Sequence, residues 1–252
     1  MPALRRVVRK MKVFLAATSD KRFIPNIEES RYILESFYYF QDWQIPLIKK
    51  SKMFLLDSGA FTFMQGRKSL DFDGYLERYI DFINKYDVDN FFELDIDSVV
   101  GYKKVKELRR RLEKETGKKS IPVWHFERGK DEYIEMCREY RYVAIGGLVG
   151  GNAEYSSRYW KYFPWFIEAA HRNGAKIHAL GFTSLKGMHE YRFDSVDSTT
   201  WKSGGRFGQL HLFKEGTIKT VLQKDKRAIY KKIDEHNFNE WLKFQKYADK
   251  NL

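Results

Sequence analysis

The stretch Phe193-Asp-Ser-Val-Asp-Ser-Thr-Thr-Trp201 indicates the fold more directly than any other part of the chain. Its apolar first half ends in two carboxylates, Asp194 and Asp197, and in neighbouring hydroxyl groups, and the glycine-rich segment Gly204–Gly208 follows. A buried strand that ends in acids and hydroxyls is typical of a parallel sheet whose strands deliver polar groups to one edge. The rest of the chain should then contain more strands of this kind.

Short apolar runs of the same type recur along the chain, and segments with helical periodicity separate them. The expected strands are Lys12–Ala17, Met53–Leu56, Phe91–Leu94, Ile121–Phe126, Tyr142–Ile145, Lys176–Leu180 and Phe193–Val196, and the expected helices are Leu70–Asn84, Val99–Glu115, Asp131–Glu139, Tyr155–Arg172 and Ser184–Glu190. This alternation predicts an α/β fold with a parallel sheet. An eighth strand within Leu210–Leu222 would close a TIM-type (β/α)8 barrel, and a doubly wound open sheet is the alternative.

The domain organisation follows from what the sequence lacks. No Pro/Gly/Ser-rich linker and no internal repeat divides the 252 residues, and 43% of them are hydrophobic, which is enough for one large core. We therefore expect one barrel domain over residues 1–252, with a basic N-terminal arm (1–11) and a C-terminal helical tail (224–252).

The amino-acid composition indicates which kinds of binding partner the protein could have. The 46 Lys and Arg residues exceed the 34 Asp and Glu residues and give a net charge of +12, which favours a polyanion such as nucleic acid, although a basic soluble protein is the alternative. Cys137 is the only cysteine, which excludes a disulfide within the chain and a zinc site built on cysteines, and fits the cytoplasm. No apolar run approaches the ~18 residues of a membrane span, so we expect no membrane contact.

Acids, glycines, histidines and aromatic residues gather where the expected strands end, which is where a parallel barrel has its site. They are Asp57-Ser-Gly-Ala-Phe61, the alternating acids Glu93, Asp95 and Asp97, then Trp124-His125, Gly146–Gly151, and His178. The acids with Asp57 and the two histidines could form a metal site of a hydrolase or isomerase, or the acids could pair with a lysine in the core. Asp57 could also simply cap the next turn.

Taken together, these strand ends resemble the tRNA-guanine transglycosylase superfamily, and more closely its phage branch of DNA-guanine transglycosylases, which place 7-deazaguanines in DNA. Asp57-Ser-Gly-Ala-Phe61 is similar to the family's DSGGF, Ala144-Ile-Gly-Gly-Leu148 to its IGGL, and Phe193-Asp-Ser-Val196 to its FDCV. The resemblance spans residues 12 to 215 and implies a TIM-type barrel and base exchange through a covalent aspartyl intermediate. The family's zinc subdomain is absent, which favours DNA over tRNA as the substrate.

The resemblance offers two candidates for the nucleophile. Matching FDCV letter by letter selects Asp194, whereas the family's spacing from the nucleophile to Arg-His-Gly selects Asp197, which precedes Arg206-Phe-Gly208 by nine residues. The branch also resembles this chain in the segment SVDST followed by Trp, which centres on Asp197. We favour Asp197 and keep Asp194 as the alternative.

The resemblance also implies the roles of the other residues. Asp57 would be the general acid/base, and guanine or the 7-deazaguanine base would be bound by Ser58, Phe61, Asp95, Trp124, His125, Gly146, Gly147 and Leu148. The expected mechanism needs neither a cofactor nor a metal. The segment Lys103–Lys119 has nine basic residues against three acidic ones, so Lys103, Lys104, Arg109 and Arg110, with Arg206, are candidates for contacts to the nucleic-acid backbone, unless this helix face is only solvated.

Overall fold

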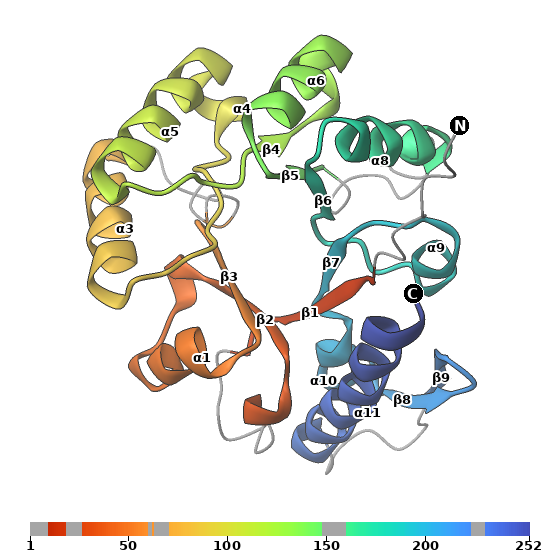
Figure 1. The fold of residues 1–252 in the computed structure, drawn as a ribbon. Helices are drawn as coiled ribbons and strands as arrows, with labels where there is room; N and C mark the ends of the chain where they lie inside the picture. The colour runs from red at the N-terminus through yellow and green to blue at the C-terminus, as the bar shows by residue number, and fades with distance from the viewer. Residues whose placement is uncertain (1–9, 19–26, 60–61, 63–70, 148–159, 223–229) are drawn as a thin grey trace.

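The protein folds around a parallel sheet of seven strands in the order β3-β2-β1-β7-β6-β5-β4 (Figure 1). The computed structural model describes residues 10–18, 27–59, 62, 71–147, 160–222 and 230–252. The strands are β1 (Lys12–Ala16), β2 (Tyr32–Ser36), β3 (Met53–Asp57), β4 (Val123–Trp124), β5 (Tyr142–Ile145), β6 (Lys176–Ala179) and β7 (Ser195–Ser198). Because the first strand pairs with both β2 and β7, the two halves of the sheet meet at β1.

Helices surround the curled sheet on its outside (Figure 1). They are α1 (Ile45–Lys50), α3 (Phe72–Tyr86), α4 (Asp97–Val100), α5 (Tyr102–Thr116), α6 (Gly129–Glu139), α8 (Phe163–Arg172), α9 (Leu185–Glu190), α10 (Ser203–Phe207) and α11 (Tyr230–Asn251). Short 3-10 helices lie at Ile27–Glu29, Phe37–Tyr39, Asp42–Gln44, Phe126–Arg128, Trp160–Tyr162 and Thr200–Lys202. None of the helices in the described part of the chain is long and apolar enough to cross a membrane.

Side-chain alternation divides the apolar residues of the sheet into two cores. One cluster lies on the inner face of the curl and consists of Phe14, Ala16, Tyr32, Leu34, Leu55, Phe92, Ile121, Val123 and Ala144. The residues between these positions, such as Leu15, Ile33 and Trp124, belong to the larger cluster that the helices share. Because successive side chains of a strand point to opposite faces, any strand residue two positions from a member of the inner cluster also faces inward.

Between the end strands β3 and β4, residues 90–93 hydrogen bond on both sides. The Leu56 N–H donates to Asn90 O (3.0 Å) and the Phe92 N–H donates to Leu56 O (2.9 Å). On the other side the Ile121 N–H donates to Phe91 O (2.8 Å) and the Glu93 N–H donates to Ile121 O (3.1 Å). The expected strand Phe91–Leu94 is therefore present only as single bridges at Phe91 and Phe92.

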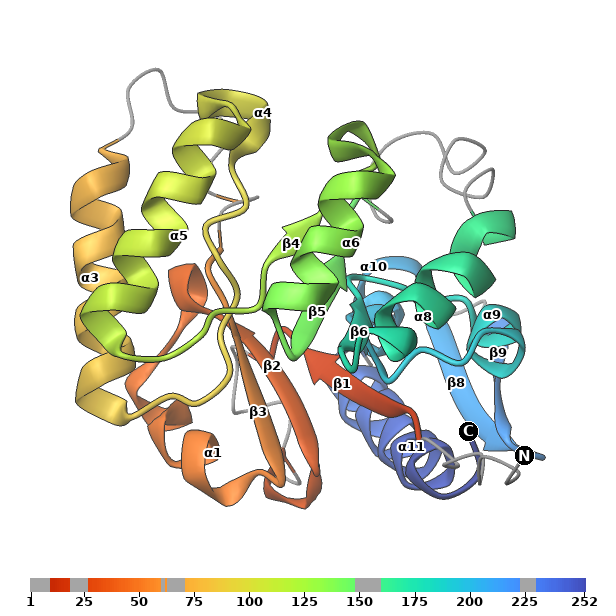
Figure 2. The same cartoon turned by 45° about the horizontal axis from the view of Figure 1, so that its top comes forward.

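The other expected strands are found with small shifts at their ends, but the sequence missed one strand and one predicted strand was wrong. Strand β2 was not predicted, because its apolar run is only Tyr32-Ile-Leu34 and a glutamate follows. The segment Leu210–Leu222 does not extend the sheet: it forms the antiparallel hairpin β8 (Gln209–Lys214) and β9 (Thr217–Leu222), which lies beside α11 (Figure 2). Its two-residue turn, Glu215-Gly216, has positive φ at both positions (53° and 78°), which favours a hairpin.

The expected helices are also found where the chain is described. The predicted helix Val99–Glu115 is divided into α4 and α5 at Gly101, whose φ of 78° is outside the helical range. Helix α5 lies beside α3 on the outside of the sheet (Figure 2). The part of Tyr155–Arg172 before residue 160, the N-terminal arm up to residue 9 and the start of the C-terminal tail lie outside the described residues.

Glu35 on β2 is a buried acid, only 2% exposed, whose Oε1 accepts a hydrogen bond from the Thr18 N–H (3.0 Å). Burial raises the pKa of Glu35 to about 7, and hydrogen bonds from Thr18 and Gln44 offset only part of that rise. The unfolded chain loses this proton near the ordinary pKa of 4.5, whereas the folded chain keeps it up to about pH 7. The free energy of unfolding should therefore fall as the pH rises through this interval.

We expect Glu35→Gln to remove this pH dependence and to raise the free energy of unfolding at pH 8 by about 1–3 kcal/mol, since the variant has no charge to bury. Urea titrations at pH 5 and pH 8 measure both effects. Glu29→Gln, at an exposed position, is the matched control and should keep the wild-type pH dependence. An unchanged slope between pH 5 and 7 in Glu35→Gln would contradict the assignment.

Candidate active site

Asp57 and Asp197 lie on the inner face of the sheet at the carboxyl ends of β3 and β7. Asp57 is two positions beyond Leu55 of the inner cluster, and Asp197 alternates with Val196 of the outer cluster. In a parallel sheet the carboxyl ends of all strands lie at the same edge. The two acids that the sequence indicated as general acid/base and favoured nucleophile therefore lie on the same face and at the same edge of the sheet.

The environment of Asp57 suits proton transfer near neutral pH. Burial, together with the charges of Asp197 and Asp95, raises the pKa of Asp57 to about 6, although hydrogen bonds from the Gly59 and Ser58 N–H groups oppose the rise. Gly59 has a φ of 74°, and a Cβ there would lie 2.6 Å from the Cβ of Tyr38. Only glycine therefore allows the turn that directs these N–H groups at the carboxylate.

Asp197 is buried, and one of its oxygens is fixed by two donors. Asp197 Oδ1 lies 3.2 Å from His178 Nε2 and accepts a hydrogen bond from the Gly181 N–H at 2.5 Å. Within the described part of the chain, Oδ2 has no hydrogen-bond partner. This arrangement fixes the rotamer of the side chain and leaves one oxygen available to a ligand.

Asp194 is placed differently. It precedes β7 at the amino-terminal end, and its Oδ2 accepts from the Ile177 N–H (2.9 Å) and lies 2.9 Å from His171 Nε2 of α8. Its own carbonyl accepts from the Lys12 N–H (3.0 Å) at the start of β1. Because 194 and 197 differ by an odd number, the two side chains point to opposite faces, about 10 Å apart along the strand. The structure does not bring Asp194 to Asp57.

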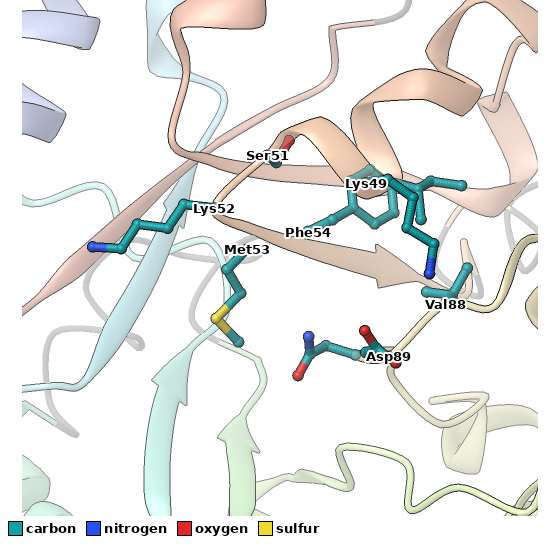
Figure 3. Close-up of a pocket in the computed structure, with 9 residues that line it drawn as sticks. Lys49, Ser51, Lys52, Met53, Phe54, Val88 and Asp89 are labelled. Atoms are coloured by element: carbon teal, nitrogen blue, oxygen red, sulfur yellow. The ribbon is translucent and has the colours of Figure 1, made fainter.

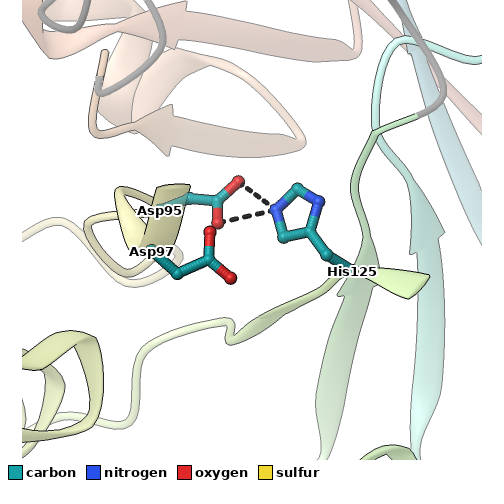
Figure 4. Close-up of side chains that lie close together, drawn as sticks. All are labelled: Asp95, Asp97 and His125. Atoms are coloured by element: carbon teal, nitrogen blue, oxygen red, sulfur yellow. Dashed lines mark hydrogen bonds and ion pairs between the residues drawn. The ribbon is translucent and has the colours of Figure 1, made fainter. Parts of the chain in front are cut away.

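Asp95 and His125 form a close pair near the same edge (Figure 4). His125 Nε2 lies 2.7 Å from both oxygens of Asp95, and about a fifth of each side chain is exposed (21% and 23%). Burial alone would lower the pKa of His125, but the hydrogen bond and charge of Asp95 outweigh it, so the pKa is raised and the imidazolium is favoured. The pair can offer both acceptors and a donor to a ligand.

Arg128, which the sequence did not single out, neutralises the acid ladder. Its guanidinium contacts Glu93 Oε1 at 3.3 Å, Asp95 Oδ1 at 3.4 Å and Asp97 Oδ2 at 2.9 Å. Only 2% of its side chain is exposed, and it lies over the Tyr102 ring at 4.1 Å. The ladder thus has an arginine counterion, where the sequence suggested a lysine or a metal. The only signal for it was the ladder itself, because buried acids need a cation.

We expect Arg128→Leu to lower the free energy of unfolding by about 3–5 kcal/mol, since it removes the buried cation that the three carboxylates share and leaves Arg109 as the counterion of Glu93 alone. The exposed Arg138→Leu on α6 is the control and should change it by less than about 0.5 kcal/mol. Urea denaturation of both variants measures the difference. Equal stabilities would show that Arg128 is not the main counterion of the ladder.

Asp95, Asp97 and His125 could also hold a metal, because one ligand atom of each lies within 4.8 Å of the others. Two other residues of the metal hypothesis, Glu93 and His178, already have partners within the protein. Glu93 pairs with Arg109 (3.1 Å) and accepts from the Val123 N–H (2.7 Å), and His178 contacts Ser195 and Asp197. A metal at this cluster would have to displace Arg128 from two of the three ligands.

Several expected base-binding residues differ from the prediction. Trp124 is 3% exposed and packs against Phe166 (4.6 Å between centroids) and Tyr133 in the outer core. Val123 faces the inside of the sheet, so the next side chain, Trp124, faces outward and away from the two acids. Ser58 is fully buried, and its Oγ has no partner among the described residues. Phe61 and Leu148 lie outside the described residues.

The glycines of the expected base-binding loop border His125. A Cβ on Gly146 would lie 2.6 Å from His125 Cε1, so glycine is what allows the ring to sit there. Gly147 is exposed, with a φ of 74°, and a Cβ on it would lie 3.3 Å from His125 Nδ1. The backbone at Gly147 is therefore accessible beside the Asp95–His125 pair.

The basic helix is only partly available to nucleic acid. Arg109 is 6% exposed and pairs with Glu93, because it shares the buried face of α5 with Val105, Leu108 and Leu112; the prediction of a phosphate contact there was wrong. Lys103 and Arg110 are exposed, and Lys104 lies 4.0 Å from Asp73. Arg206 belongs to α10, but its side chain lies outside the described part.

A pocket at the opposite end of β3 does not include the candidate acids (Figure 3). Lys49, Lys52, Met53, Asp89 and Asn90 are among the residues that line it. Met53 begins β3 and Asp57 ends it, so the pocket and the acids lie at different ends of the strand.

Comparison with known proteins leaves the family open. No family model matches the chain, and no curated protein matches it. Among solved structures, the chain is similar to the carboxyl transferase domain of Rhizobium etli pyruvate carboxylase, solved with 3-bromopyruvate, at 12% identity and a TM-score of 0.46. The match covers 94% of this chain and 48% of that one, so this chain spans about half the length of that structure.

Proposed function

We propose that the protein is a nucleic-acid guanine transglycosylase that exchanges guanine in DNA for a 7-deazaguanine base through a covalent bond to Asp197. The observation that supports it best is the placement of Asp57 and Asp197 on one face at the carboxyl ends of their strands, with Asp57 titrating near pH 6. One carboxylate is then available to attack while the other handles a proton.

The fold belonging to this proposal is a complete (β/α)8 barrel in which residues 90–93 take the place of the fourth strand. The strand register supports it. Followed from Met53 through β2, β1, β7, β6, β5 and β4 and across residues 90–93, the register returns to β3 eight residues beyond its start. A stagger of eight residues around eight strands is the shear of the TIM barrel.

The same stagger supports a meeting of the two acids. Asp197 pairs in register with Phe14, and through β1 and β2 it corresponds to Met53. The strands are tilted, so hydrogen-bonded partners on neighbouring strands differ in height along the barrel axis by about one residue per strand. Over the three steps from β3 to β7, Asp197 therefore lies at about the height of Leu56. Asp57 is the next residue, so the two inward-facing carboxylates lie at nearly the same height.

The proposed reaction proceeds in two displacements at C1′ of the target nucleotide. Asp197 Oδ2 attacks C1′ as the bond from C1′ to N9 breaks, and N9 takes the proton of Asp57, which releases guanine. The incoming base then attacks C1′ from its own ring nitrogen, Asp57 takes that nitrogen's proton, and the bond to Asp197 breaks. Two inversions retain the configuration at C1′.

Recognition of the base would rest on the Asp95–His125 pair. Guanine presents N1–H and a 2-amino group on one edge, and the Asp95 carboxylate is an acceptor for both. The exposed backbone at Gly147 lies beside the other nitrogen of His125, where it could contact the opposite edge. The target base would have to leave the duplex, and Lys103 and Arg110 are exposed candidates for phosphate contacts.

Incubation with labelled 7-deazaguanine base and separate pools of DNA and tRNA tests the proposal. We expect label in DNA and, on a denaturing gel, a covalent adduct between the protein and an oligonucleotide. Label in tRNA alone would make the substrate tRNA. Absence of both label and adduct from either pool would overturn the proposal.

The second candidate is a metal-dependent hydrolase or isomerase, favoured by the Asp95, Asp97 and His125 cluster. Metal analysis of the purified protein, with activity measured in a chelator, separates the two. Base exchange that persists in chelator supports the transglycosylase.

A further inference from the structure

Three polar side chains form a connected chain on the inner face, on the amino-terminal side of Asp197. They are Tyr142 of β5, His178 of β6 and Ser195 of β7, which come from three neighbouring strands. The register pairs His178 with Ser195 directly. Ser195 and Asp197 are two positions apart, so both face His178.

The hydrogen bonds of this chain run in one direction. A carboxylate has no proton to give, so the contact of His178 Nε2 with Asp197 Oδ1 (3.2 Å) requires the proton on Nε2. In the neutral imidazole, Nδ1 can then accept from the hydroxyl of Ser195 (2.6 Å), which in turn can accept from the hydroxyl of Tyr142. In this arrangement every member donates toward Asp197, and the imidazole tautomer with its proton on Nε2 satisfies all of these contacts.

The His178 ring is enclosed by other side chains and has no contact with solvent. His178 is 0% exposed, and its ring lies 5.9 Å from that of Phe14 and 5.5 Å from that of Phe92. Burial raises the pKa of Tyr142, so its hydroxyl stays protonated as the first donor. In this apolar environment an unpaired ring nitrogen would cost free energy. Burial of His178 therefore favours keeping both of its hydrogen bonds formed.

We propose that His178 and Ser195 are positioning residues that hold Asp197 Oδ1 in place, so that Oδ2 is presented to C1′. This inference rests on the proposed function and deepens it. Ser195 fixes the tautomer, His178 Nε2–H and the Gly181 N–H fix one carboxylate oxygen, and the other oxygen has no partner within the described residues. The effect belongs to the chemical step, because the side chains of His178 and Ser195 are fully buried and cannot contact the nucleic acid themselves.

The test compares three variants by single-turnover adduct formation and by steady-state exchange. His178→Leu removes both ring hydrogen bonds, His178→Gln keeps an N–H that can reach Asp197, and Ser195→Ala removes the hydroxyl that fixes the tautomer. We expect His178→Leu to lower kcat about 10–100-fold with KM for DNA within about threefold. His178→Gln should recover most of this loss, and Ser195→Ala should lower kcat about tenfold.

The melting temperature of each variant is measured as well, to separate a loss of activity from a loss of stability. If the larger change at His178 prevents folding, the smaller change Ser195→Ala still tests the inference. Wild-type kcat in Ser195→Ala and His178→Leu would overturn the inference. So would a loss that follows the melting temperature, affects KM equally and is not rescued by Gln. Asp197→Asn separates the two levels: if it is inactive while the His178 variants are normal, only the positioning role fails, whereas full activity of Asp197→Asn overturns the proposed function itself.

Discussion

Asp197→Asn is expected to abolish base exchange, with a loss of at least about 10⁴-fold in kcat, because an amide cannot form the glycosyl ester. The variant keeps the size of the side chain and an oxygen that can accept from the Gly181 N–H, so the strand end should remain folded. Binding of a DNA oligonucleotide should persist within a few-fold. Denaturing gels should show no adduct, whereas the wild-type protein should form one.

Asp194→Asn is the matched control, since it makes the same chemical change three residues earlier on the other face of the strand. It weakens the contact to His171 and should lower the free energy of unfolding by about 1–2 kcal/mol, while exchange stays within about threefold of wild type. If Asp194→Asn abolished the adduct and Asp197→Asn did not, the roles of the two aspartates would be reversed.

The sequence could distinguish these two aspartates only by spacing, and the structure adds the physical reason. A one-residue change of register moves a side chain to the opposite face of a strand. Val196 packs outward, so Asp197 faces inward and Asp194 faces α8. The same reasoning applies to Trp124, which the sequence suggested as a surface for base stacking. Its neighbour Val123 faces inward, so Trp124 faces outward into the larger core.

The strands that the sequence located are those with long enough apolar runs, and the ones it missed have an identifiable cause. The apolar run of strand β2 stops at Glu35, and a buried glutamate has no signature in a hydrophobicity pattern. The hairpin β8–β9 was mistaken for one barrel strand because its turn is only Glu215-Gly216. Local composition identifies such a turn only if positive φ is expected at a glutamate, which is uncommon.

Side-chain partners across strands could not be predicted from the sequence in the same way. Arg128 reaches Glu93, Asp95 and Asp97 from the turn after β4, and the donor chain to Asp197 depends on β5, β6 and β7 being in a particular register. Both arrangements need the three-dimensional order of the strands. The sequence could predict which residues lie at the strand ends, but not which of them hold the others in place.

The pH dependence of adduct formation should depend on Asp57. Release of guanine needs its proton, and the pKa of about 6 means that the protonated fraction falls about tenfold per pH unit above that value. Single-turnover adduct formation by the wild-type protein should therefore slow down between pH 6 and 8. Asp57→Asn should lower the rate about 10²–10⁴-fold and remove this decline, because an amide neither gives nor takes the proton.

Asp95→Asn tests whether the Asp95 charge raises the pKa of Asp57. The Asp95 charge is one of the causes that raise the pKa of Asp57, after burial and the charge of Asp197, so its removal should move the midpoint of the decline to lower pH. The variant should also bind the target base less tightly, but at saturating DNA a change in affinity does not move the midpoint of the profile. A midpoint that stays in place in Asp95→Asn, or a decline that persists in Asp57→Asn, would mean that another group supplies the proton.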